Sequence, residues 1–166
     1  MAKRPAPHDM IDEIVADFAR ERPDIDTALV ETASRIIFTG RKMEERATRT
    51  VQALGFHYTD YDTLGMLRTA GPPYELTPAE LLRRVMITSG AMTACLKRLE
   101  AAGMITRRVD ERDRRVKHVR LTERGLVQAD AALSERYADA AKVIARLSEA
   151  EMKALNKLLR KAGAER

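Results

Sequence analysis

Tryptophan is absent from this 166-residue sequence, and aromatic residues make up only 4% of it. This scarcity argues against a sugar-binding surface and against a platform on which bases stack. The single cysteine, Cys95, cannot close a disulfide within the chain, so it fits a reducing compartment. No apolar run approaches the length of about 20 residues that spans a bilayer, and the N-terminal residues lack the hydrophobic core of a secretory signal. We therefore expect a cytoplasmic protein that has no membrane partner.

Candidate catalytic and metal-binding groups are also scarce. His8, His57 and His118 lie in the N-terminal arm, in a loop between predicted helices and in a predicted hairpin. They share no helix face, no spacing of Cys and His suits zinc, and no glycine-rich phosphate loop follows a strand. An enzyme needs a convergent acid, base, nucleophile or metal set. The sequence therefore predicts a protein that is not an enzyme and that uses no cofactor or metal.

Apolar residues at helical spacing dominate most of the chain. They predict a short helix that begins near residue 10, a long helix over residues 26 to 53 and another over residues 58 to 69. A capping box with proline at the first helical position, Thr77-Pro78-Ala79-Glu80, begins the next helix. A further helix follows closely, with Thr88 and Ser89 as candidate N-caps and Gly103 as its end.

The spacing of apolar residues changes from helical to alternating after Gly103. Apolar residues flank a polar turn on alternate positions, which predicts a two-stranded hairpin; they are Ile105, Val109, Val116, Val119 and Leu121. A long helix then begins near Thr122, and a second capping box, from Ser148 to Glu151, opens the last helix. These elements predict a mainly α fold with a small β-hairpin wing, in which two closely spaced helices and the hairpin form a winged helix-turn-helix domain.

The second helix of a helix-turn-helix lies in the major groove of DNA, so its first turns must be small and polar. Here they read Thr88-Ser89-Gly90-Ala91-Met92-Thr93, and Lys97 and Arg98 follow on the polar side. We predict contacts to double-stranded DNA from this helix, by Thr88, Ser89, Gly90, Thr93, Lys97 and Arg98. Arg98 is expected on a phosphate because it lies near the helix end. Ordinary helix capping is the alternative explanation of Thr88 and Ser89, and the two roles can coexist.

The predicted hairpin is strongly basic. Residues 107 to 120 contain seven Lys or Arg and three Asp or Glu. At its turn, Arg112, Arg114 and Arg115 alternate with carboxylates that can hold the guanidinium groups in a fixed pose. Because arginines at a hairpin tip can enter the narrow minor groove, we expect these three to contact DNA. The alternative is a merely solvated, charged turn.

Several of these motifs, in this order and spacing, resemble the MarR family of bacterial regulators. They are Leu96-Lys97-Arg98-Leu99-Glu100, Gly103-Met104-Ile105, the turn from Asp110 to Arg115 and Leu121-Thr122-Glu123-Arg124-Gly125. The resemblance implies a homodimeric transcription regulator, expected to be a repressor, whose two winged domains bind a pseudo-palindromic operator. It also implies a helical dimerisation region (9–55 and 122–166) and a winged helix-turn-helix DNA-binding domain (56–121). The first eight residues contain two prolines and no apolar period, so we expect a disordered arm (1–8) before them.

Residues 17 to 26 are similar to the N-terminal extension of the urate-responsive branch of this family, which senses its ligand with a Trp, an Asp and two Arg. Asp62 and Arg107 match that set, whereas Phe18 stands at the Trp position and Cys95 at one Arg position. The lost cation argues against urate itself. We expect a small organic or aromatic acid to bind near Phe18, Asp62, Cys95 and Arg107 and to release the repressor. The alternative is that Asp62 and Arg107 form a structural ion pair and no ligand binds.

Two other functions remain open at this point. Cys95 could make the protein a redox-responsive regulator, although its place on the inward side of the recognition helix favours a packed, inert thiol. The winged fold could also be a protein-interaction module without DNA binding. A DNA binder loses affinity steeply as salt rises, whereas a mainly apolar interface does not.

Overall fold

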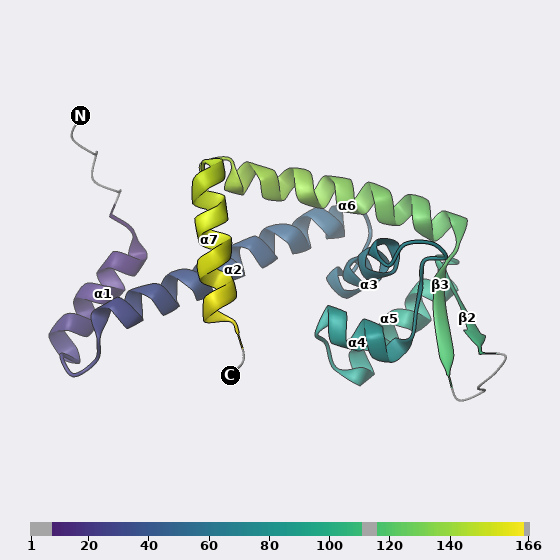
Figure 1. Ribbon diagram of the computed structural model, residues 1–166, viewed down its shortest axis with the longest axis horizontal. Coiled ribbons are helices and arrows are strands. Elements are labelled where there is room, and N and C mark those ends of the chain that lie inside the picture. The colour runs from purple at the N-terminus through teal and green to yellow at the C-terminus, as the bar shows by residue number, and fades with distance from the viewer. Residues whose placement is uncertain (1–7, 111–115, 165–166) are drawn as a thin grey trace. The chain divides into compact units, whose positions relative to one another are not determined.

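The computed structural model describes residues 8–110 and 116–164, which form two compact units that divide between Arg46 and Ala47. Figure 1 labels the elements in chain order: α1 (Met10–Glu21), α2 (Thr27–Ala53), α3 (Tyr58–Thr69), β1 (Glu75–Leu76), α4 (Pro78–Val85), α5 (Ser89–Ala101), β2 (Ile105–Val109), β3 (Lys117–Leu121), α6 (Glu123–Ile144) and α7 (Glu149–Ala162). This order confirms the predicted mainly α fold with a β-hairpin after two short helices. None of the described helices combines the length and the apolarity that crossing a membrane requires.

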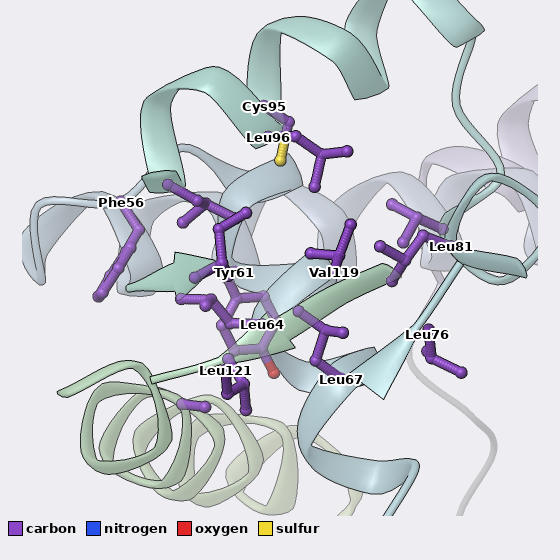
Figure 2. Close-up of a cluster of buried hydrophobic side chains, with 14 of the residues drawn as sticks. Phe56, Tyr61, Leu64, Leu67, Leu76, Leu81, Cys95, Leu96, Val119 and Leu121 are labelled. Carbon is purple, nitrogen blue, oxygen red and sulfur yellow. The ribbon is translucent and has the colours of Figure 1, made fainter. Parts of the chain in front are cut away.

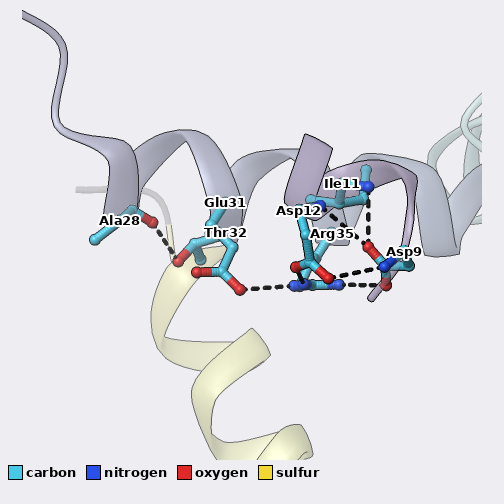
Figure 3. Close-up of polar contacts among 7 residues, drawn as sticks. All are labelled: Asp9, Ile11, Asp12, Ala28, Glu31, Thr32 and Arg35. Atoms are coloured by element: carbon cyan, nitrogen blue, oxygen red, sulfur yellow. Dashed lines mark hydrogen bonds and ion pairs between the residues drawn. The ribbon is translucent and has the colours of Figure 1, made fainter. Parts of the chain in front are cut away.

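The first unit contains α1 and most of α2, which are joined by ion pairs around Arg35. Asp9 caps α1 by accepting hydrogen bonds from the backbone N–H groups of Ile11 and Asp12. The guanidinium of Arg35, on α2, donates to Asp9 at 2.8 Å, to Asp12 at 2.5 Å and to Glu31 at 2.9 Å (Figure 3). The same carboxylates that begin α1 therefore also attach it to α2.

The second unit is built around a single apolar core. Side chains from α3, α4, α5, the sheet and α6 pack together there, as Figure 2 shows for residues that include Leu64, Leu67, Leu81, Leu96 and Val119. The inward positions predicted for α3, Tyr61, Leu64 and Leu67, are all buried. This core fixes the helix-turn-helix and the hairpin relative to each other.

The sheet contains one strand that the sequence pattern did not predict. In the described part of the chain, three antiparallel strands lie in the order β1-β3-β2. Glu75 pairs with Arg120 and Leu76 with Val119, so β1 covers the free edge of β3. A strand of two residues is too short to show an alternating period, and it forms because β3 offers it backbone partners.

The predicted helix boundaries follow from local capping. Thr77 and Glu80 form a capping box at the start of α4, as Ser148 and Glu151 do for α7. Met86 ends α4 in the left-handed conformation, with φ of 54°. Thr88 then caps α5, so only three residues, 86–88, separate the two helices.

Candidate nucleic-acid interface

Helix α5 has one buried face and one exposed face. Met92, Cys95, Leu96 and Leu99 are buried in the core. The other residues from the start of the helix to Arg98 are exposed to solvent: Ser89, Gly90, Ala91, Thr93, Ala94, Lys97 and Arg98. The exposed face is small and polar, as an element that enters the major groove requires.

The hydroxyl groups at the start of α5 make bonds within the helix. The Thr88 Oγ1 atom accepts a hydrogen bond from the N–H of Ala91 at 3.3 Å, and Thr93 Oγ1 donates to the Ser89 carbonyl at 2.9 Å. Thr88 is thus the N-cap, as the alternative explanation proposed, and it is also exposed. Because the Thr93 hydroxyl hydrogen is bonded inside the helix, Thr93 presents its methyl group and oxygen lone pairs to a partner.

Arg98 has a partner within the chain that sequence reasoning missed. Its Nη2 and Nε atoms donate to the two carboxylate oxygens of Asp60, at 2.6 and 3.0 Å, and Nη2 also reaches Thr59 Oγ1 at 3.3 Å. Asp60, on α3, is only 5% exposed. The hydrogen bond to this carboxylate raises the pKa of Arg98. The pair holds α5 against α3, whereas a phosphate contact of Arg98 stays a prediction.

Cys95 lies in the core between α5 and α3. Its Sγ atom is 3.2 Å from Thr63 Oγ1 and 3.5 Å from the Thr59 carbonyl oxygen. Burial raises the pKa of the thiol to about 12. The predicted inward position of Cys95 is confirmed, and a ligand that reaches this thiol must enter the core.

The hairpin of β2 and β3 is held at its base by polar contacts. Arg108 on β2 donates to both carboxylate oxygens of Glu75 on β1, at 2.7 and 2.9 Å. The backbone N–H of Asp110 donates to the Val116 carbonyl, which closes the ladder toward the turn. The predicted DNA-binding arginines of the turn, Arg112, Arg114 and Arg115, lie outside the described residues.

The predicted ligand residues fall on different elements. Asp62 is partly buried on α3, and Phe18 belongs to α1 of the first unit. Arg107, on β2, forms an ion pair with Glu100 of α5 at 2.8 Å. The structure thus gives Arg107 an acidic partner from the C-terminal end of the recognition helix.

Known proteins resemble this chain over most of its length. A model of the MarR family matches residues 54–116. The HTH-type transcriptional regulator PecS of Dickeya dadantii (strain 3937) is 28% identical over 152 residues, which are 90% of each sequence.

Solved structures share the fold. A mutant MarR from E. coli complexed with operator DNA gives a TM-score of 0.68 at 22% identity, with 95% of this chain and 100% of that chain covered. Bordetella bronchiseptica BpsR, described with regulation of its DNA binding by 6-hydroxynicotinic acid, gives a TM-score of 0.64 at 20% identity, with 78% of this chain and 99% of that chain covered.

Proposed function

This chain belongs to the MarR family of transcription regulators, and from that premise we propose that it acts as a homodimeric repressor that binds a pseudo-palindromic operator in double-stranded DNA. The observation that supports this proposal most is the exposed face of α5, where small and polar residues stand opposite the core. A helix of this kind fits the major groove, in which base edges present distinct donors and acceptors. The two-fold symmetry of a dimer would match an operator of two half-sites.

Exposed apolar side chains support the dimer. In the first unit, Leu29 of α2 is 64% exposed, and Ile36 and Ile37 are also exposed. In the second unit, Tyr137 of α6 is 67% exposed, and α7 buries none of its residues although Leu155, Leu158 and Leu159 follow one stripe. Exposed apolar side chains that gather on one helix are typical of a protein interface. We assign them to a second copy of the chain.

The proposed activity is binding rather than catalysis. Within residues 8–110 and 116–164, no group of three or more His, Cys, Asp or Glu side chains is arranged to hold a metal ion. PecS, a relative that matches 90% of the chain, is named as a regulator. We therefore assign the chain no reaction.

The DNA-binding surface can be tested at Lys97, which is exposed on α5 between the buried turns. Fluorescence anisotropy with a labelled duplex from upstream of its own gene would give the affinity. We expect Lys97→Ala to weaken binding about tenfold, because a phosphate contact is lost. Lys153→Ala is the matched control, since Lys153 is an exposed lysine of α7. Equal affinities of the wild type and Lys97→Ala would place the DNA elsewhere.

We also propose that a small organic or aromatic acid releases the repressor by binding near Arg107. A carboxylate ligand can take the place of Glu100 as the partner of Arg107, because guanidinium and carboxylate groups pair with charge-assisted hydrogen bonds. BpsR, which has the same fold, is described with 6-hydroxynicotinic acid, an acid of this class. Such a ligand acts only through its different affinities for the DNA-bound and free conformations. Phe18, Asp62 and Cys95 stay predicted ligand residues.

Calorimetry with a panel of organic and aromatic acids tests the effector. We expect heat from at least one acid with the wild type, a reduction of the affinity of at least about tenfold in Arg107→Ala, and no change in Arg124→Ala. Arg124 is an exposed arginine at the start of α6 and serves as the matched control. Equal heats from the wild type and Arg107→Ala would remove Arg107 from the ligand site.

A further inference from the structure

A carboxylate is buried where α3 packs against the recognition helix α5. Within the described part of the chain two polar residues are buried, Asp60 and Thr63, and both belong to α3. Thr63 donates to the Thr59 carbonyl of its own helix. Asp60 instead accepts hydrogen bonds from Arg98, a residue of α5 that is exposed to solvent. A buried charge of the core therefore acts on the exposed face of the recognition helix.

The guanidinium of Arg98 uses three of its five N–H groups within the chain. The single hydrogen of Nε goes to Asp60 Oδ2, and Nη2 donates to Asp60 Oδ1 and to Thr59 Oγ1. Among the residues that the structure describes, Nη1 has no hydrogen-bond partner. The Arg98 side chain is 41% exposed. The two N–H groups of Nη1 are therefore available to a group outside the chain.

The pair of Asp60 and Arg98 gives the guanidinium a fixed direction. A buried ion pair is often no more stabilising than apolar side chains of the same volume, because its charges lose their hydration. Apolar side chains of both helices, such as Leu64 of α3 and Leu96 of α5, already share one core. What the pair adds is orientation, since two bonds between a planar guanidinium and a carboxylate set the plane of the guanidinium.

We propose that Asp60 is a positioning residue for DNA binding, which holds the guanidinium of Arg98 so that Nη1 donates to a backbone phosphate. This inference rests on the proposed function, because it assigns a role to one residue of the recognition helix. Phosphate oxygens accept charge-assisted hydrogen bonds from arginine and carry most protein–DNA contacts. An arginine that is already ordered loses less side-chain entropy on binding. Asp60 therefore raises the affinity for DNA although its own charge repels the phosphates.

Removal of this carboxylate separates positioning from simple electrostatics. Asp60→Asn keeps one acceptor oxygen but puts an NH2 group, which cannot accept, against the guanidinium. It also removes a negative charge from each subunit, so long-range attraction alone predicts tighter binding to DNA. Positioning predicts the opposite sign. We expect the affinity of the full chain for a labelled duplex from upstream of its gene to fall about tenfold, the scale of ordering one arginine in each subunit.

The salt dependence of this affinity gives a readout that a role of Asp60 in stability alone would not change. Each phosphate contact adds about 0.9 to the magnitude of the slope of log affinity against log salt. With one contact in each subunit, we expect this magnitude to fall by about 2 in Asp60→Asn, as in Arg98→Gln. The double variant should bind no more weakly than Arg98→Gln, because Asp60 acts through Arg98.

Asp130→Asn is the matched control for the change of charge. Asp130, on α6, pairs with Arg68 of α3 at 2.6 Å, so its replacement also removes one carboxylate from an arginine pair. This variant should keep the wild-type slope, because neither residue belongs to the recognition helix.

Arg98→Lys tests the same claim while it leaves the buried Asp60 in place. A lysine keeps the charge but cannot make a two-point pair with a carboxylate, so the slope should fall as in Arg98→Gln. Urea denaturation shows which variants are folded under the binding conditions. A wild-type slope in Asp60→Asn, or in Arg98→Lys if Asp60→Asn does not fold, would overturn the inference and leave the DNA-binding proposal standing. A folded wild type that binds no duplex would overturn both.

Discussion

Arg98 shows how the role of a residue depends on a partner that its own helix does not contain. Its position near the end of α5 indicated a phosphate contact, but the structure pairs it with Asp60 of α3. An aspartate in the first turn of a helix looks like an ordinary response to the helix dipole, so the sequence did not single it out. The sequence did offer one signal that Asp60 is buried, because its neighbour Tyr61 lies at a predicted inward position.

By contrast, the burial of Cys95 followed from its spacing with Met92 and Leu99, because helical periodicity alone decides which face is inward.

The thiol of Cys95 should be unreactive in the folded protein. Thiolate is the reactive form, and with the pKa raised to about 12 it becomes abundant only far above neutral pH. At about pH 8, we expect an alkylating reagent to modify native protein at least about 100-fold more slowly than urea-unfolded protein. Mild peroxide treatment should leave the affinity for duplex DNA unchanged. The redox alternative would be supported instead if peroxide abolished binding by the wild type but not by Cys95→Ser.

At the scale of elements, the helices were predictable and the edge strand was not. Capping boxes at Thr77 and Ser148 are local signals, and a helix that follows one needs little else to define its start. Strand β1 has no such signal because its two residues are ordered by pairing with β3. The contact of Glu75 with His118 was missed for the same reason, since it exists only once β1 lies beside β3.

The start of α6 lies so close to the backbone of Met104 that only glycine fits at position 125. A Cβ atom on Gly125 would lie 1.9 Å from the Met104 carbonyl oxygen and 2.9 Å from its carbon. Because this oxygen belongs to the backbone before β2, the helix itself would have to move. We expect Gly125→Ala to lower the free energy of unfolding by about 3 kcal/mol, measured by urea denaturation at fixed protein concentration without DNA.

Gly90→Ala is the matched control for this substitution. No atom lies within 4 Å of a Cβ at Gly90, which is helical. Alanine should therefore raise the free energy of unfolding by about 0.5 kcal/mol. If both alanine variants unfolded at the same urea concentration, the contact between α6 and the Met104 backbone would have no part in stability.

At the scale of the whole molecule, the dimer is the part that a single chain reveals least directly. The spacing of apolar residues predicted stripes on α2, α6 and α7, and the structure leaves much of these stripes exposed. A stripe that packs within the chain and one that packs against a second copy have the same helical period, so periodicity cannot separate them. The structure divides the chain within α2, between Arg46 and Ala47, whereas the dimerisation region predicted from the family resemblance joins residues 9–55 to 122–166. That assignment stays a prediction.

The salt dependence of duplex binding tests the central claim most directly, namely that the recognition helix and the basic wing of each subunit bind DNA phosphates together. Plotting the logarithm of the affinity against the logarithm of the salt concentration counts the phosphates that the protein neutralises. We predict a steep negative slope for the wild type, and a slope smaller in magnitude by about 2 to 5 when Arg112, Arg114 and Arg115 are all replaced by alanine in both subunits. An affinity and a slope that these three substitutions leave unchanged would contradict the account.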